Sequence, residues 1–145
     1  TLSVAESCTG GLISHMVTSV PGSSSYFLFS GITYSNQAKM DVLGVSSEIL
    51  EKFGAVSEEV VKEMAEGVRR VSGSLYGLST SGIAGPDGGT DDKPVGTICI
   101  GVSGPGFLKG FQYNLSFGSR SRNKTLFAMA ALELLRRELD PSFKK

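Results

Sequence analysis

The sequence has no tryptophan, a single histidine (His15), two cysteines and no excess of charge of either sign. Because the fourteen basic and fourteen acidic residues cancel, the composition provides no broad attraction to nucleic acid or to an anionic membrane. No apolar run approaches the roughly 20 residues of a membrane-spanning helix. One histidine, with Cys8 and Cys99 outside any metal-ligand spacing, excludes a typical zinc site. Nothing indicates a disulfide scaffold, so we expect two buried cysteines and a cytoplasmic location.

The chain has 145 residues, a length typical of one domain, and its 19 glycines indicate many tight turns. Strand-like and helical segments alternate in the first half, and a hairpin follows. Strands are expected at 1–5, 26–34, 76–81, 95–102 and 108–117. Helices are expected at 12–20, at 36–43, from 46, from 57 and at 124–139. The last helix is predicted to bury a stripe made of Leu126, Met129, Ala130, Leu132 and Leu135.

These elements predict an α/β fold, with three α/β/α layers around a mixed, mostly parallel sheet. We expect one domain over residues 1–145. The opening "TLSV" lies inside a strand-like run, so the natural chain is expected to extend further back.

Polar and glycine-rich stretches fall where the expected strands end, which is where layered α/β folds bind ligands. "ESCTGG" offers the free backbone N–H groups of a helix start, which favour an anion, although a plain capped turn is equally consistent. "GIAGPDGG" matches neither a Walker A loop nor a GxGxxG fingerprint. Arg120, Arg122 and Lys124 form a basic cluster that could clamp a phosphate or simply face solvent.

"GITYSNQAK" places Tyr34 and Lys39 five residues apart. The tyrosine–lysine pair of short-chain dehydrogenases is four apart on one helix face, so a dehydrogenase is disfavoured. If Tyr34 ends a strand and Lys39 lies in the next helix, both side chains could enter one pocket. A buried lysine can act as a general base, and a serine from positions 23–25 is a candidate nucleophile. The alternative is a serine-rich turn, a strand tyrosine and a surface lysine.

Taken together, the motifs "AESCTGG", "PGSSSYF", "GITYSNQAK", "GAVSEEVVKEMAEG", "SGIAGPDGGTDDKPVGT" and "FGSRSRN" resemble the CinA C-terminal domain family. The resemblance runs from Ala5 to the last helix. It implies a nicotinamide mononucleotide (NMN) deamidase, also called PncC, which hydrolyses the carboxamide of NMN to nicotinate mononucleotide and ammonia. This reaction returns a by-product to pyridine nucleotide (NAD) synthesis. The resemblance implies no cofactor and no metal, and it implies a homo-oligomer, which we expect to be a dimer or trimer.

Carried over residue by residue, the resemblance implies a catalytic serine at Ser24, a tyrosine at Tyr34, a lysine base at Lys39 and a further hydroxyl at Ser81. The nucleotide is expected to contact the turns around these residues. The predicted substrate contacts are Ser7, Thr9, Gly10, Asn36, Gly85, Asp87, Gly88 and Arg120.

The chain departs from the family pattern in two places. The usual Gly-Asp-Arg reads Gly118-Ser119-Arg120, and the helix that usually precedes the first strand is missing. The alternative function is a nucleotide-binding or regulatory module of the same fold without turnover.

Overall fold

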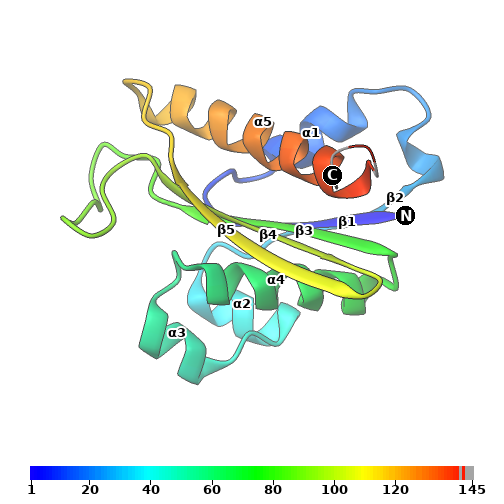
Figure 1. The fold of residues 1–145 in the computed structure, drawn as a ribbon, viewed down its shortest axis with the longest axis horizontal. Helices are drawn as coiled ribbons and strands as arrows, with labels where there is room; N and C mark the ends of the chain where they lie inside the picture. Colours follow the sequence, from blue (N-terminus) through cyan, green and yellow to red (C-terminus); the bar gives the residue numbers. More distant parts are fainter. Residues whose placement is uncertain (141, 143–145) are drawn as a thin grey trace.

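The computed structural model describes residues 1–140 and 142, and it contains one five-stranded sheet between two layers of helices (Figure 1). The strands are ordered β2-β1-β3-β4-β5 across the sheet. Helices α1 and α5 cover one face, and α2, α3 and α4 cover the other (Figure 1). The elements are β1 (Leu2–Glu6), α1 (Leu12–Thr18), the 3-10 turn η1 (Ser23–Ser25), β2 (Phe27–Ile32), α2 (Asn36–Leu43), α3 (Ser47–Phe53), α4 (Glu58–Ser72), β3 (Tyr76–Gly82), β4 (Thr97–Gly104), β5 (Phe107–Asn114) and α5 (Arg120–Leu139).

The sheet is mixed, as predicted. β1 pairs in parallel with β2 and with β3, whereas β4 pairs antiparallel with β3 and β5. The predicted hairpin is therefore confirmed as β4–β5. The carboxyl ends of β1, β2 and β3 lie at the same end of the sheet, and the loops that leave these strand ends build the site described below.

Each face of the sheet has its own core. Val4, Ile100 and Phe127 belong to the cluster beneath α1 and α5, whereas Ala5 and Met64 belong to the cluster beneath α2, α3 and α4. The neighbours Val4 and Ala5 face opposite sides because side chains alternate along a strand. β4 is buried along its full length, as expected for a strand covered on both faces.

Helix α4 packs directly against the sheet backbone at two strand glycines that face it. A Cβ added to Gly77 would lie 2.1 Å from the carbonyl oxygen of Ala65, and one added to Gly101 would lie 2.1 Å from that of Val61. No side chain could occupy either position without moving the helix backbone, since real Cβ contacts are never so short.

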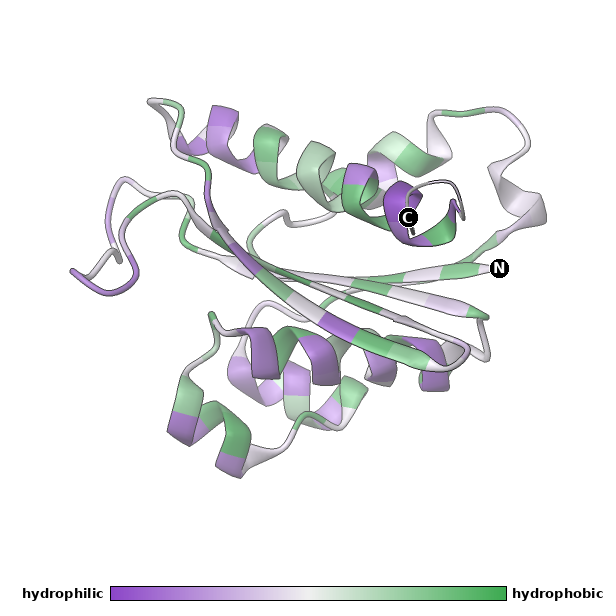
Figure 2. Ribbon diagram, viewed as in Figure 1, coloured by the Kyte–Doolittle hydropathy of each residue, from purple (hydrophilic) through white to green (hydrophobic). Residues whose placement is uncertain are grey.

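The predicted stripe on the last helix is confirmed at Leu135, is partly buried at Ala130 and Leu132, and is wrong at Met129. The buried side chains of α5 are Asn123, Phe127, Ala128, Ala131 and Leu135, whereas Met129 is 55 % exposed. The helix also begins at Arg120, four residues earlier than predicted, because Ser119 caps it by accepting a hydrogen bond from the Arg122 N–H (3.4 Å). Figure 2 shows hydrophilic residues on the outer surfaces of the helices and in the loop that follows β3.

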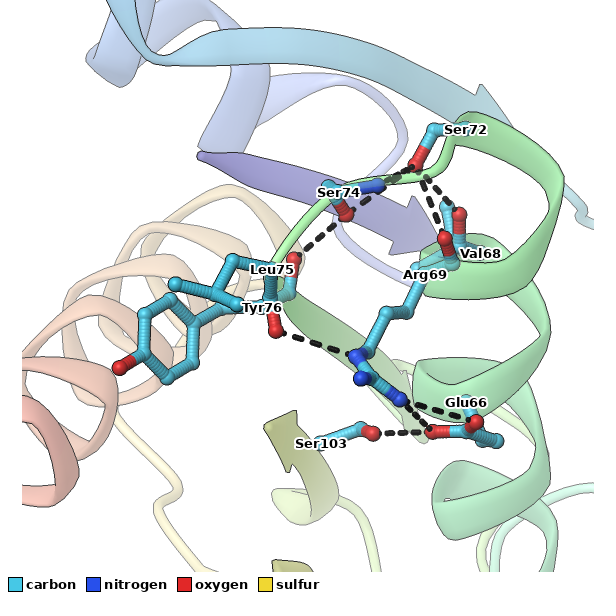
Figure 3. A network of polar contacts seen from close by, with 8 residues as sticks. All are labelled: Glu66, Val68, Arg69, Ser72, Ser74, Leu75, Tyr76 and Ser103. Atoms are coloured by element: carbon cyan, nitrogen blue, oxygen red, sulfur yellow. Dashed lines mark hydrogen bonds and ion pairs between the residues drawn. The ribbon is translucent and has the colours of Figure 1, made fainter. Parts of the chain in front are cut away.

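A network of polar contacts stabilises the opposite end of the sheet, where the turn after α4 leads into the start of β3 (Figure 3). The Arg69 guanidinium donates to the Glu66 carboxylate and, through Nε, to the Leu75 carbonyl (3.0 Å). The Ser103 hydroxyl donates to the same Glu66. These contacts tie the α4–β3 turn to β4.

Among the described residues, none of the helices combines the length and apolar character that a bilayer crossing requires.

Candidate active site

A cavity of about 260 Å³ opens at the carboxyl ends of β1 and β3. It is lined by residues from the β1–α1 turn, the start of α2, the segment before α4, the loop after β3 and the start of α5. The lining residues are Ser7, Cys8, Tyr34, Lys39, Ala55, Val56, Ser81, Gly82, Ile83, Ala84, Asp87, Gly88 and Arg120. The cavity therefore brings together seven of the predicted site residues, namely Ser7, Tyr34, Lys39, Ser81, Asp87, Gly88 and Arg120.

Lys39 is the most unusual side chain in this cavity because it is 1 % exposed. α2 begins at Asn36 after the Ser35 cap, so Lys39 sits one turn into the helix and points back toward the end of β2. Its Nζ donates to the carbonyl oxygens of Thr33 (3.0 Å) and Tyr34 (3.1 Å) and to the Ser7 hydroxyl (3.3 Å).

Burial lowers the pKa of Lys39 from its ordinary value of 10.5, because a charged amine loses hydration inside the protein. No carboxylate forms an ion pair with Lys39 in the described part of the chain. Hydrogen bonds to neutral oxygens hold the amine in position without the stabilisation that a counter-ion would give its charge. Burial therefore shifts Lys39 toward the neutral amine, the form that can accept a proton.

Tyr34 contributes to the cavity through its backbone and its phenol separately. The backbone carbonyl binds Lys39, whereas the phenol oxygen accepts a hydrogen bond from Arg120 Nη2 (3.0 Å). Arg120 also donates through Nη1 to the Gly85 carbonyl (2.7 Å). The five-residue spacing thus brings Tyr34 and Lys39 into one cavity, across a strand end and a helix start, and Arg120 holds the phenol at the rim.

Cys8 brings a thiol to the cavity, but its environment makes this thiol unreactive. Burial raises the pKa of the Cys8 thiol to about 12, and the same cause raises the pKa of Cys99 to about 12. A thiol attacks as its thiolate, which is scarce at neutral pH when the pKa is this high. Both cysteines are free and buried, as predicted.

Ser24 lies at the other end of the sheet from Lys39 within one chain. Its turn, η1, precedes β2 and is fixed beside the start of β1 by the Leu2 N–H bond to the Tyr26 carbonyl (2.7 Å). Figure 1 shows this light-blue turn near the N-terminus, on the right, while the loop after β3 projects to the left. The six residues of β2 separate the two sites by about 20 Å at the usual rise per residue. Ser24 is exposed and does not line the cavity.

The "ESCTGG" turn does bind an anion at the start of α1, but that anion is the protein's own Glu6. The buried Glu6 carboxylate accepts hydrogen bonds from the N–H groups of Gly11 (3.0 Å), Ile13 (3.1 Å) and Ser14 (2.9 Å). These donors are therefore already used. The sequence signal for this role was Glu6 itself, at the first position of "ESCTGG".

Two predicted substrate contacts face elsewhere. Thr9 is fully buried, and its hydroxyl pairs with that of Thr80 (2.9 Å), so it supports the β1–α1 turn from inside. Asn36 lines a separate hollow between α2 and α3. Gly85 has a positive φ of 84° and is buried, and it contributes the carbonyl that accepts from Arg120.

A second, larger cavity of about 670 Å³ shares Arg120 with the first. It lies between the starts of α1 and α5 and includes the predicted residue Gly10. Sequence reasoning did not connect His15 with Lys124, although both line this cavity. Lys124 was visible in the basic cluster of the sequence, whereas the position of His15 depends on how α1 packs on α5.

The Lys39 cavity lies at the strand ends of a three-layer α/β domain, which is where such folds place their ligands. The chain belongs to the CinA C-terminal domain family, whose model matches residues 1–139. A CinA-like protein from Desulfosudis oleivorans is 66 % identical over 139 residues, which cover 96 % of this chain and 34 % of that protein. One from Desulforapulum autotrophicum is 57 % identical, over 96 % and 33 %. The chain therefore spans about a third of the length of these curated relatives.

Solved structures of the same superfamily have the same fold. The competence/damage inducible protein CihA from Agrobacterium tumefaciens aligns with a TM-score of 0.90 at 38 % identity, over 93 % of this chain and 82 % of that one. A CinA superfamily protein from Escherichia coli aligns with a TM-score of 0.90 at 31 % identity, over 95 % and 80 %.

Proposed function

We propose that this domain is an amidohydrolase that converts NMN and water to nicotinate mononucleotide and ammonia, using a serine nucleophile and Lys39 as the base. The observation that carries the proposal is Lys39 itself. It is a buried amine with a lowered pKa and no ion-pair partner in the described chain, and its Nζ lies 3.3 Å from the Ser7 hydroxyl. A pure binding site has no need for such a base, because a charged surface lysine would hold a phosphate equally well. The family membership supports the same activity.

In the proposed reaction, neutral Lys39 accepts the serine proton while the serine oxygen attacks the carboxamide carbon. The protonated amine then gives this proton to the departing nitrogen, which leaves as ammonia. Water attacks the resulting ester, again with Lys39 as the base, and releases the carboxylate product and the free serine. Tyr34 and Ser81 line the cavity around the reacting group and are proposed to orient it.

The nucleophile remains Ser24 in this proposal, and the geometry then requires a second copy of the chain. β2 is an edge strand, with Leu28 49 % and Ile32 57 % exposed. Two copies that pair antiparallel along β2 would place the start of one β2 beside the end of the other. Ser24 of one copy would then approach Lys39 of its partner. We therefore propose a homodimer contact along β2, with Ser7 holding the Lys39 amine inside each chain.

The test is an ammonia-release assay over a panel of pyridine nucleotides with the intact protein. Lys39→Ala and Ser24→Ala are expected to lower kcat by about a thousandfold or more, as removal of a base or a nucleophile commonly does. Ser25→Ala is the matched control, because the Ser25 hydroxyl bonds only locally, to the Gly22 carbonyl (2.8 Å). Folding of each variant is checked by circular dichroism.

Near wild-type ammonia release by both variants would contradict the mechanism. Loss of activity in Ser7→Ala with an unaffected Ser24→Ala would assign the nucleophile to Ser7. Saturable NMN binding by wild-type protein without any ammonia would support the non-catalytic module instead.

A further inference from the structure

The cavity between the starts of α1 and α5 concentrates positive charge in a chain whose net charge is zero. Its lining residues are Gly10, Gly11, Leu12, His15, Arg120, Ser121, Lys124 and Thr125. Two of them are permanent or near-permanent cations, a third is the only histidine of the chain, and no acidic residue is among them. At about 670 Å³ the cavity is within the range that holds small-molecule ligands.

The two cations face the same way because of their helical spacing. Arg120 and Lys124 are four residues apart on α5 and so lie on one face. Arg122, between them, turns to the other side and stacks on the Phe117 ring, with 6.0 Å between Cζ and the ring centroid. The basic cluster of the sequence thus divides into two residues that line the cavity and one that does not.

Lys124 has no acceptor or ion-pair partner within the described residues. Its Nζ lies above Gly10, 3.3 Å from where a Cβ on that residue would be. Gly10 has a positive φ of 60°, a conformation that other residues rarely adopt, and its missing side chain leaves the amine room to face the cavity. The backbone donors of α1 are not available to a ligand, since Glu6 already accepts from them, so the side chains must provide the recognition.

Arg120 connects this cavity to the Lys39 cavity, since it lines both. We propose that the cavity formed by Gly10, His15, Arg120 and Lys124 is an anion site that takes the phosphate monoester of the substrate. The carboxamide would then lie beside Lys39, with Arg120 between the two ends. This assignment rests on the proposed function, but the anion site itself can be tested without turnover.

The first measurement is calorimetric titration with inorganic phosphate at constant ionic strength. Lys124→Gln is expected to weaken phosphate binding about ten- to hundredfold, the loss typical of one charge-assisted hydrogen bond. Arg122→Gln removes the same charge from the same helical turn outside the cavity, and it is expected to bind phosphate like wild type. Equal binding by all three proteins, or equal weakening in both variants, would overturn the site.

The second measurement compares NMN with nicotinamide riboside, which lacks the phosphate. In Lys124→Gln the ratio of kcat/KM for NMN to that for the riboside is expected to fall about ten- to hundredfold, mainly through KM for NMN. Phosphate is expected to compete with NMN. An unchanged ratio, or non-competitive inhibition, would show that the cavity binds free phosphate rather than that of the substrate. If no protein releases ammonia, the calorimetric result still decides the anion site, and only the proposed function fails.

Discussion

The burial of Lys39 predicts how activity depends on pH. If the neutral amine is the base, kcat/KM must rise with pH as the amine loses its proton, with an apparent pKa below 10.5 because burial lowers the pKa of Lys39. Lys39→Arg keeps the positive charge but cannot give it up, so it is expected to be inactive at every pH. The measurement is ammonia release across the pH range. A profile that does not change with pH below 10.5 would contradict Lys39 as the base.

The same pKa shift predicts a stability difference of known sign. Between the lowered pKa of folded Lys39 and the unfolded value near 10.5, the unfolded chain binds more protons than the folded one. The free energy of unfolding attributable to Lys39 therefore rises with pH through this window, and the penalty of burying its charge is greatest below it. Urea denaturation of wild type and Lys39→Met should show a difference that shifts in favour of wild type as the pH approaches 10.5. A shift toward the variant would contradict the buried neutral amine.

At the residue scale, the sequence predicted which kinds of side chain are present better than it predicted where those side chains point. The five-residue gap from Tyr34 to Lys39 could indicate a shared pocket or a surface lysine, and only the packing around α2 decides between them. Glu6 illustrates the same limit. A glycine turn before a helix predicts an anion, but whether a ligand or a neighbouring carboxylate supplies it depends on how β1 lies beneath α1.

At the element scale, the sequence predicted all five strands and all five helices, but several ends are displaced: β4 was expected at 95–102 and spans Thr97–Gly104. The helix over 36–43 was predicted with the bounds that the structure has, and the helix expected from 57 begins directly after its Ser57 cap, because helix ends depend on a few neighbouring residues. The start of α5 and part of its buried face were not predicted correctly. Ser119 is the cap of α5, and the aspartate that the family resemblance leads one to expect at this position would serve the same role equally well. The buried face depends on contacts with α1 and the sheet that the periodicity of this apolar helix does not reveal.

The close approach of α4 to the sheet predicts a large cost for one added methyl group. In Gly101→Ala the new Cβ would meet the Val61 carbonyl, so α4 must move, and a loss of about 1–3 kcal/mol in the free energy of unfolding is expected. Gly31→Ala, on β2, is the control, because its nearest contact is the side-chain ring of Phe29 at 3.3 Å, which can adjust. Urea denaturation measures both. Equal stability of the two variants would show that the α4 backbone yields more easily than its packing indicates.

For the whole molecule, the separation of Ser24 from Lys39 means that the proposed activity depends on how copies of the chain assemble. If Ser24 is the nucleophile and Lys39 the base, the two groups lie about 20 Å apart at opposite ends of β2, and a complete site forms only if two copies combine. β2 and β5 are the two edge strands of the sheet, and among the described residues the outer side of β2 has no paired neighbour. An unpaired edge with apolar side chains is a ready surface for a second strand.

This arrangement predicts that two inactive variants restore activity when they are mixed. A heterodimer of Ser24→Ala and Lys39→Ala contains one site with both groups intact, so random subunit exchange is expected to recover about one quarter of wild-type activity. The measurement is ammonia release after mixing under conditions that allow exchange, with each variant alone as the control. Leu28→Lys, on the exposed edge of β2, tests whether the dimer forms through this strand. This variant is expected to sediment as a monomer and to abolish the recovery of ammonia release. If mixing restores nothing although subunits exchange, then each site is built within one chain, and Ser7, already bonded to Lys39, is the serine that acts there.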